Sequence, residues 1–243
     1  MELVEAPEPR YKMKLFHSVI FVIPILLIAI VFLNKILFGI NDPFYRDLAS
    51  EDNLIENLTV YAYFLAFGFS LFILKYIKKN IGVFSIFLIL SIIFLIVGLE
   101  EISYGQRILG FNNLMFSRNM QEEINIHNLD LVQPYRHFYY ISASFLGSFS
   151  WLIFPKIQFF SKNELFIKYV LPPKFLFIYF SSVLIIVSVM KYVSVEFING
   201  NVTFGFFINY DAEFFELILA LGLMLFTINS FYNIRNQHQF LRK

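Results

Sequence analysis

Acidic residues at the ends of apolar segments are the feature of this sequence best suited to chemistry. The stretch LEEISYGQRILG ends an uncharged run of 19 residues and places Glu100 and Glu101 side by side. If the run is a helix, the pair lies at its C-terminus, where the helix dipole disfavours anions, and the two carboxylates repel each other. One more helical turn would bring Tyr104 and Arg107 beneath Glu100. An acidic pair at this position needs a cation, which is Arg107, Arg136 or a metal ion.

Two other apolar segments begin with acidic residues. Glu56 falls near the start of SEDNLIENLT, and Glu213 and Glu216 share a helical face in DAEFFELIL. Acidic residues in a first helical turn also suit the dipole, so the position alone does not establish a site. On the topology argued below, however, 14 of the 18 acidic residues lie on one side of the membrane. We therefore predict a polar site at that side, with Glu56, Glu100 and Glu101 as catalytic groups.

A histidine motif lies in the long connection between the third and fourth apolar segments. In NMQEEINIHNLD, Glu123, His127 and Asp130 stand at positions i, i+4 and i+7, which form one stripe if the segment is helical. Such a set can ligate a divalent metal ion, or His127 can act as a general base. A histidine in a polar loop is more often simply solvated, and Glu-x-x-x-His is weaker than the established zinc and di-iron signatures. Glu123, His127 and Asp130 are the candidate metal ligands, and the cofactor is otherwise open.

Two of these motifs together resemble a known family. GLEEISYGQRILGF followed by NMQEEINIHNL is similar to uncharacterised bacterial multi-pass membrane proteins that carry a Glu-Glu-Ile-Ser-aromatic-Gly-Gln-Arg stretch and then an Asn-x-His-Asn segment. The aromatic residue is usually Trp in that family and is Tyr104 here. The resemblance covers roughly residues 51–129 and brings no known activity with it. It implies a shared site at Glu56, Glu100, Glu101, Gln106, Arg107, His127 and Asn128.

Substrate binding is expected of four residues in this stretch. Arg107 would hold an anionic head group, because a guanidinium pairs well with phosphate or carboxylate oxygens. The expected substrate-binding residues are Tyr104, Gln106, Arg107 and Asn128.

Membrane helices must position these residues. The chain has 243 residues, is 58% hydrophobic and 20% aromatic, and has a mean hydropathy of +0.66. Average proteins are about 45–50% apolar, and a hydrocarbon core needs about 17–25 residues of helix. The sequence therefore predicts an all-α, polytopic membrane protein with a single domain over residues 1–243. The six expected transmembrane helices cover approximately residues 15–38, 54–75, 81–102, 135–155, 174–195 and 211–234.

Basic residues predict the orientation of the helices. Thirteen of the 19 Lys and Arg lie in the two terminal segments and the second and fourth connections. By the positive-inside rule both termini are cytoplasmic, and the long loop between helices three and four is extracytoplasmic. The expected location is a bacterial inner membrane. The absence of cysteine excludes disulfides and thiolate ligands, and a net charge of +1 gives no support to nucleic-acid binding.

Three function classes stay open on the sequence alone. The first is a hydrolase or transferase acting on a lipid or lipid-linked substrate at the membrane surface, with a carboxylate or His127 as general base. The second is a transporter or channel for a cation or small solute, although no charged residue lies in the middle of any of the six apolar runs. The third is a non-catalytic subunit of a membrane assembly. The expected partners are the lipid bilayer and a lipid-linked substrate, and the oligomeric state is open.

Overall fold

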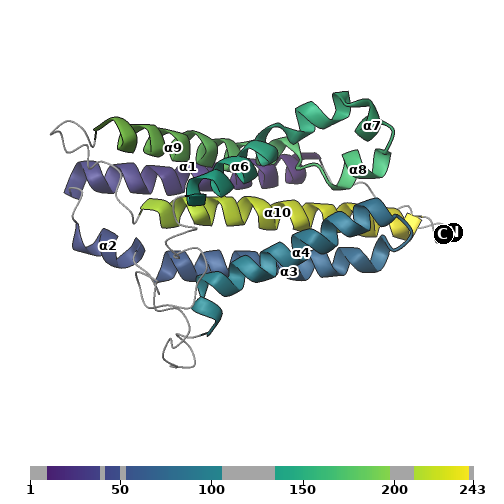
Figure 1. Cartoon of the computed structure of the whole chain (residues 1–243), viewed down its shortest axis with the longest axis horizontal. Coiled ribbons are helices and arrows are strands. Elements are labelled where there is room, and N and C mark those ends of the chain that lie inside the picture. The colour runs from purple at the N-terminus through teal and green to yellow at the C-terminus, as the bar shows by residue number, and fades with distance from the viewer. Residues whose placement is uncertain (1–9, 39–41, 50–52, 106–134, 198–210, 241–243) are drawn as a thin grey trace.

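Long helices dominate the structure. A computed structural model describes residues 10–38, 42–49, 53–105, 135–197 and 211–240, and this part of the chain is helical without strands, which confirms the all-α class (Figure 1). Six of its helices are long, and one lies over each range in which the sequence predicts a helix. They are α1 (Arg10–Phe38), α3 (Leu54–Tyr76), α4 (Ile81–Glu101), α6 (Arg136–Ile153), α9 (Phe177–Phe197) and α10 (Asp211–Phe240).

Short helices connect the long ones. They are α2 (Pro43–Ala49), η1 (Ser103–Gly105), η3 (Phe154–Lys156), α7 (Gln158–Ser161), α8 (Glu164–Tyr169) and η4 (Lys174–Leu176). Both α4 and α8 begin at an asparagine whose side chain accepts a hydrogen bond from a backbone N–H three residues on, as Asn80 does from Val83 at 3.0 Å. Such caps satisfy a backbone donor that the helix itself leaves unpaired.

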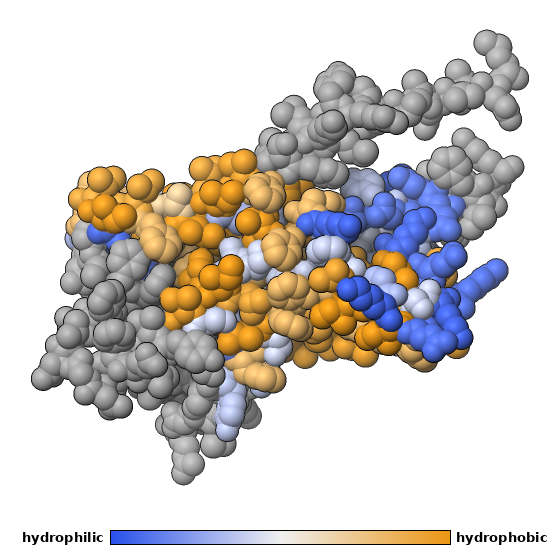
Figure 2. All heavy atoms as spheres, turned by 90° about the horizontal axis from the view of Figure 1, so that it is seen from above, coloured by the Kyte–Doolittle hydropathy of each residue, from blue (hydrophilic) through white to orange (hydrophobic). Residues whose placement is uncertain are grey.

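Within the described ranges, four helical stretches are long and apolar enough to cross a membrane. They are Ile20–Phe38, Leu54–Tyr76, Ile81–Glu101 and Asp211–Gln237, while the apolar stretch Lys174–Val189 is shorter. Large apolar side chains such as Leu26, Leu33 and Ile89 face outward, as a lipid-facing surface requires. Figure 2 shows hydrophobic residues over most of one face and hydrophilic residues gathered at one end. The chain is therefore compatible with a membrane protein, and the crossing of all six long helices stays a prediction.

Helix α10 occupies the centre of the bundle. It packs against α3, which packs against α4, while α6 packs against α9 and α9 contacts α10 (Figure 1). Every residue from 214 to 220 is buried. Apart from Glu216 this stretch is apolar on all its sides, and such a stretch is stable only when other helices surround it.

Small residues bring α6 and α9 close together. A Cβ atom added to Gly147 would lie 2.2 Å from the ring of Phe180, so only glycine fits there. Ser144 and Ser148 on the same helix are fully buried. Close approach of this kind is how helices associate in a membrane.

The two ends of the bundle differ in charge. The acidic end holds the first turns of α3 and α10 and the last turn of α4, and carries Glu56, Glu100, Glu101, Asp211, Glu213 and Glu216. The basic end holds the α3–α4 turn, α7 and α8, and carries Lys75, Lys78, Lys79, Lys156, Lys162 and Lys168. In Figure 1 the basic end is on the right and the acidic end on the left.

Candidate functional site

Three glutamates from two helices converge at the acidic end. Glu101 is the last residue of α4, and Glu213 and Glu216 lie in the first two turns of α10. One carboxylate oxygen from each of the three lies within 4.8 Å of the others. Glu216 is buried, and Glu101 and Glu213 are half-buried. We call Glu101, Glu213 and Glu216 the acidic cluster.

Two further glutamates stand next to the acidic cluster. Glu56 in the first turn of α3 and Glu100 in α4 are each only 7% exposed. Both lie near enough to Glu101 for electrostatic interaction. Glu56 is far from Glu100 and Glu101 in the sequence. The fold brings the three together because α3 begins and α4 ends at the same end of the bundle.

Tyrosines line the acidic cluster on its inner side. The hydroxyl of Tyr140 in α6 donates a hydrogen bond of 2.7 Å to Oε1 of Glu216. Tyr63 in α3 is buried, stacks obliquely on Phe94, and interacts electrostatically with Glu101 and Glu216. The Tyr140 hydroxyl can orient the Glu216 carboxylate, because a hydrogen bond to one of its oxygens restricts its rotation.

The chain leaves α4 abruptly after Glu101. The helix does not continue for another turn, because Ser103 (φ 46°) and Tyr104 (φ 51°) adopt left-handed conformations, which are uncommon for residues other than glycine. Tyr104 nevertheless reaches Glu100. Partial burial and a hydrogen bond with Glu100 raise the pKa of the Tyr104 hydroxyl to about 12.

A second buried polar group lies beside the acidic cluster. The ammonium of Lys35 in α1 pairs with Oδ2 of Asp211, and the hydroxyl of Tyr45 in α2 donates to Oδ1 of the same carboxylate. The side chains of Lys35 and Asp211 are fully buried. Burial, together with the Asp211 carboxylate, raises the pKa of Tyr45. We call Lys35, Tyr45 and Asp211 the balanced group.

Like charges held this close favour a cation between them. Ionised carboxylates within a few ångströms of one another repel strongly when they are shielded from water, so they share a proton or hold a positive ion. Two oxygens on one divalent ion lie at most about 4.0–5.2 Å apart, twice the usual metal–oxygen distance. The oxygens of the acidic cluster, which lie within 4.8 Å of one another, fall in the upper part of that range, which the longer Ca²⁺–oxygen distances set; a smaller ion such as Mg²⁺ would draw them closer.

Several residues of the predicted site lie outside the described part of the chain. The structure brings together the predicted catalytic residues Glu56, Glu100 and Glu101 and keeps Tyr104 beside them. Glu213 and Glu216 were visible in the sequence as a pair on one helical face, but their convergence with Glu101 was not. Outside the described residues are Gln106, Arg107, Glu123, His127, Asn128 and Asp130, which include the whole predicted Glu123–His127–Asp130 metal set.

Comparison with protein-family models, curated proteins and solved structures finds no match to this chain.

Proposed function

We propose that this protein is a polytopic membrane protein that binds a divalent cation through Glu101, Glu213 and Glu216. We further propose that it uses the ion as a hydrolase or transferase on a lipid or lipid-linked substrate at the extracytoplasmic membrane surface. The observation that supports this most directly is the convergence of three carboxylates within 4.8 Å at the end of a buried helix.

The donor set indicates the kind of ion. Carboxylate oxygens are hard ligands and suit Mg²⁺, Mn²⁺ or Ca²⁺, whereas softer metals prefer the thiolates that this chain lacks. A bound divalent ion lowers the pKa of a coordinated water and stabilises the charge that develops on a phosphoryl or acyl group under attack. Three carboxylates leave coordination positions for water and substrate.

The neighbouring residues supply the other groups that such a reaction needs. Glu56 and Glu100 are buried next to Glu101 and can accept a proton from the attacking water. Tyr140 holds Glu216 in place. In this proposal Arg107, Gln106 and Asn128 hold the substrate head group and His127 is a second candidate base, all four being predictions from the sequence.

The depth of the cluster favours a lipid substrate. Glu101 and Glu216 stand at or near the ends of the apolar stretches Ile81–Glu101 and Asp211–Gln237, which is the level of the lipid head groups if these helices cross the membrane. Transport is less well supported, because residues 57–74 of α3, 82–99 of α4 and 217–234 of α10 contain no charged side chain. A path for ions would need polar groups at that depth.

The proposed orientation places the acidic end outside the cell membrane and both termini in the cytoplasm. The excess of Lys at the basic end supports it. A reporter that is active only in the cytoplasm should be active when fused after Lys79 or Lys243 and inactive when inserted at Asn113. Activity at Asn113 would reverse the orientation and place the acidic cluster inside.

Metal binding tests the proposed function directly. Purified wild-type protein should bind Mn²⁺ or Mg²⁺ by isothermal titration calorimetry at about one ion per chain, and the variants Glu101→Gln and Glu216→Gln should lose this binding. Gln keeps the volume of Glu and removes its charge. Glu164→Gln is the matched control, because Glu164 is exposed at the basic end. If the wild type binds no divalent ion, or if Glu164→Gln weakens binding as much as Glu101→Gln, the proposal is wrong.

A further inference from the structure

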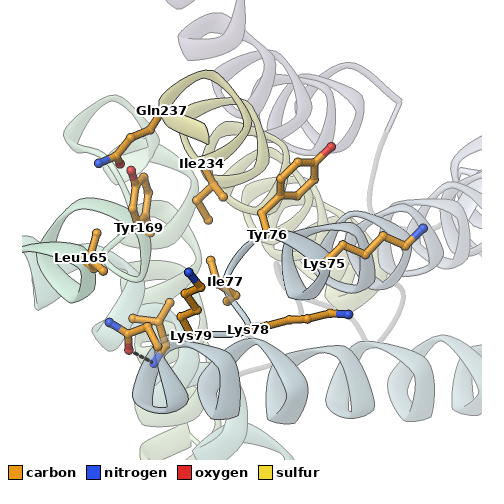
Figure 3. Close-up of a pocket in the computed structure, with 11 residues that line it drawn as sticks. Lys75, Tyr76, Ile77, Lys78, Lys79, Leu165, Tyr169, Ile234 and Gln237 are labelled. Carbon is orange, nitrogen blue, oxygen red and sulfur yellow. Dashed lines mark hydrogen bonds between the residues drawn. The ribbon is translucent and has the colours of Figure 1, made fainter. Parts of the chain in front are cut away.

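A hollow at the basic end lies between the α3–α4 turn, α8 and the last turns of α10. It encloses about 530 Å³. Lys75, Lys78 and Lys79 line it from the turn, and Tyr169 and Gln237 line it from α8 and α10 (Figure 3). In Figure 3 Lys79 is directed toward the hollow, whereas Lys75 and Lys78 extend away from it.

The lysines alone do not indicate a ligand. Basic residues gather in cytoplasmic connections because they orient the helices during membrane insertion, and exposed lysines are normally solvated. A ligand site therefore needs a further observation that membrane insertion does not explain.

Tyr169 supplies that observation. Its side chain is 3% exposed and lines the hollow, yet its hydroxyl has no hydrogen-bond partner among the residues that the structure describes. The hydroxyl of Ser230 in α10 donates to the backbone carbonyl of Tyr169 at 2.8 Å, which ties this residue to α10. Buried hydroxyl groups are almost always hydrogen-bonded, so an acceptor is expected to enter the hollow.

Apart from Asn80, the rest of the lining is largely apolar. Ile77, Val83 and Ile234 are 9%, 1% and 4% exposed and contribute to the wall of the hollow. An occupant must therefore combine an anionic acceptor with hydrocarbon. The stretches Leu54–Tyr76 and Ile81–Glu101 both have an end at this turn, so the hollow lies at head-group level in a membrane.

A neighbouring hollow extends the same surface. It encloses about 670 Å³ beneath α7 and α8, shares Asn80 and Leu165 with the first, and adds Phe159, Phe160 and Lys162. Phe159 is 80% exposed. Exposed aromatic and basic side chains on a short helix are typical of a segment that lies in the membrane interface.

We propose that the hollow at the basic end binds an anionic phospholipid. The phosphate accepts hydrogen bonds from the Lys79 ammonium and the Tyr169 hydroxyl, and the start of the acyl chains packs on Ile77 and Ile234. Basic pockets between membrane helices bind anionic head groups in this way. The inference is independent of the acidic cluster, which lies at the other end of the bundle.

Lipid-dependent melting of the full-length protein tests the proposal. In detergent, added phosphatidylglycerol should raise the melting temperature by several degrees more than the same amount of phosphatidylcholine, because a ligand that binds the folded state stabilises it. Lys79→Gln should raise the phosphatidylglycerol concentration needed for half of this shift by about tenfold, the loss of one charge-assisted contact. Lys156→Gln is the control, because Lys156 is exposed at the same end and does not line the hollow.

Tyr169→Phe separates a ligand contact from a merely buried hydroxyl. Without lipid the variant should melt at or above the wild-type temperature, because it removes a buried polar atom that has no partner among the described residues. With phosphatidylglycerol it should show a smaller stabilisation than the wild type. If the difference in melting temperature between Tyr169→Phe and the wild type is the same with and without phosphatidylglycerol, the hydroxyl contacts no lipid and the proposed phosphate contact is wrong.

Three results would overturn the proposal. The first is equal stabilisation of the wild type by phosphatidylglycerol and phosphatidylcholine. The second is an equal effect of Lys79→Gln and Lys156→Gln. The third is stabilisation by soluble glycerol phosphate as strong as that by phosphatidylglycerol, which would make the site one for a free phosphate compound and not for a lipid.

Discussion

Two polar groups stand at the acidic end, one fully buried and one partly buried, and they balance charge in opposite ways. In the balanced group, Lys35 neutralises Asp211, and Tyr45 satisfies the second carboxylate oxygen. In the acidic cluster, Glu101, Glu213 and Glu216 bring three carboxylates within 4.8 Å. Both groups depend on the start of α10, where Asp211 precedes Glu213 by two residues.

The comparison separates a structural role from a binding role. The balanced group joins α1, α2 and α10 and can fix the first turn of α10. Because Lys35 already neutralises Asp211, the group has no excess negative charge to attract a metal ion. The acidic cluster carries more negative charge than a stable interior tolerates without a counter-ion. A substitution that removes one charge should therefore lower the unfolding free energy in the balanced group, and in the acidic cluster it should leave the unfolding free energy unchanged or raise it.

The largest effect is expected when the balanced group is broken. Lys35→Met leaves Asp211 buried without its cation, which costs about 3–5 kcal/mol of unfolding free energy for a fully buried pair. The melting temperature in detergent should fall accordingly. The double variant Lys35→Met, Asp211→Leu should recover part of the loss, because apolar residues of similar volume often replace a buried ion pair without cost, while the Tyr45 hydroxyl loses its acceptor. A single variant that melts like the wild type would show that the pair is not shielded from water.

The next effect concerns the acidic cluster and has the opposite sign. Without divalent ions, Glu101→Gln should leave the melting temperature unchanged or raise it, because it relieves like-charge repulsion. With Mn²⁺ at a hundred times its Kd, the wild type should gain about 2.7 kcal/mol and the variant should gain far less. If the variant is instead as unstable as Lys35→Met without any metal, Glu101 has a cationic side chain as its partner.

The sequence predicted the helices well because local signals define them. Uncharged runs long enough to cross a membrane can be found in the sequence without knowledge of any distant contact. Glu100 and Glu101 were identifiable because two anions at a helix C-terminus contradict a local rule. The predicted end of this helix near residue 102 agrees with α4 within one residue, but the left-handed conformations of Ser103 and Tyr104 that follow have no signal in residue type.

Contacts between distant residues account for what the sequence did not predict. The Tyr140–Glu216 hydrogen bond joins residues 76 apart, and the Lys35–Asp211 pair joins residues 176 apart. No periodicity within one segment shows such a contact. Lys35 has no local signal that it pairs with Asp211, because the pair forms only when α1 and α10 pack side by side.

A smaller effect is expected from the hydroxyl that orients the acidic cluster. Tyr140→Phe removes the 2.7 Å hydrogen bond to Oε1 of Glu216 and keeps the ring. Loss of a group that orients a metal ligand typically weakens metal binding about 10–100-fold, so Mn²⁺ titration should show a shift in that range. Tyr139→Phe is the matched control, because the neighbouring Tyr139 is 60% exposed. Equal affinities for the two variants would remove Tyr140 from the site.

The smallest effect is a change in the alkaline titration of Tyr104, which senses the charge beside the acidic cluster. Partial burial and the hydrogen bond with Glu100 raise the pKa of Tyr104 to about 12. The folded protein thus holds this proton more tightly than the unfolded chain, whose tyrosines titrate near about 10. The resulting stability is fully present below about pH 10 and is lost as the pH rises from 10 toward 12, because the folded state binds more protons in that window.

Ultraviolet absorption of tyrosinate can follow the titration, and the difference between wild type and Tyr104→Phe assigns it to this residue. Glu100→Gln should lower the pKa of Tyr104 without returning it to 10, because burial is the larger cause and remains. A Tyr104 titration that is identical in wild type and Glu100→Gln would show that Glu100 carries no charge at that pH, and would take it out of the electrostatic surroundings of the acidic cluster.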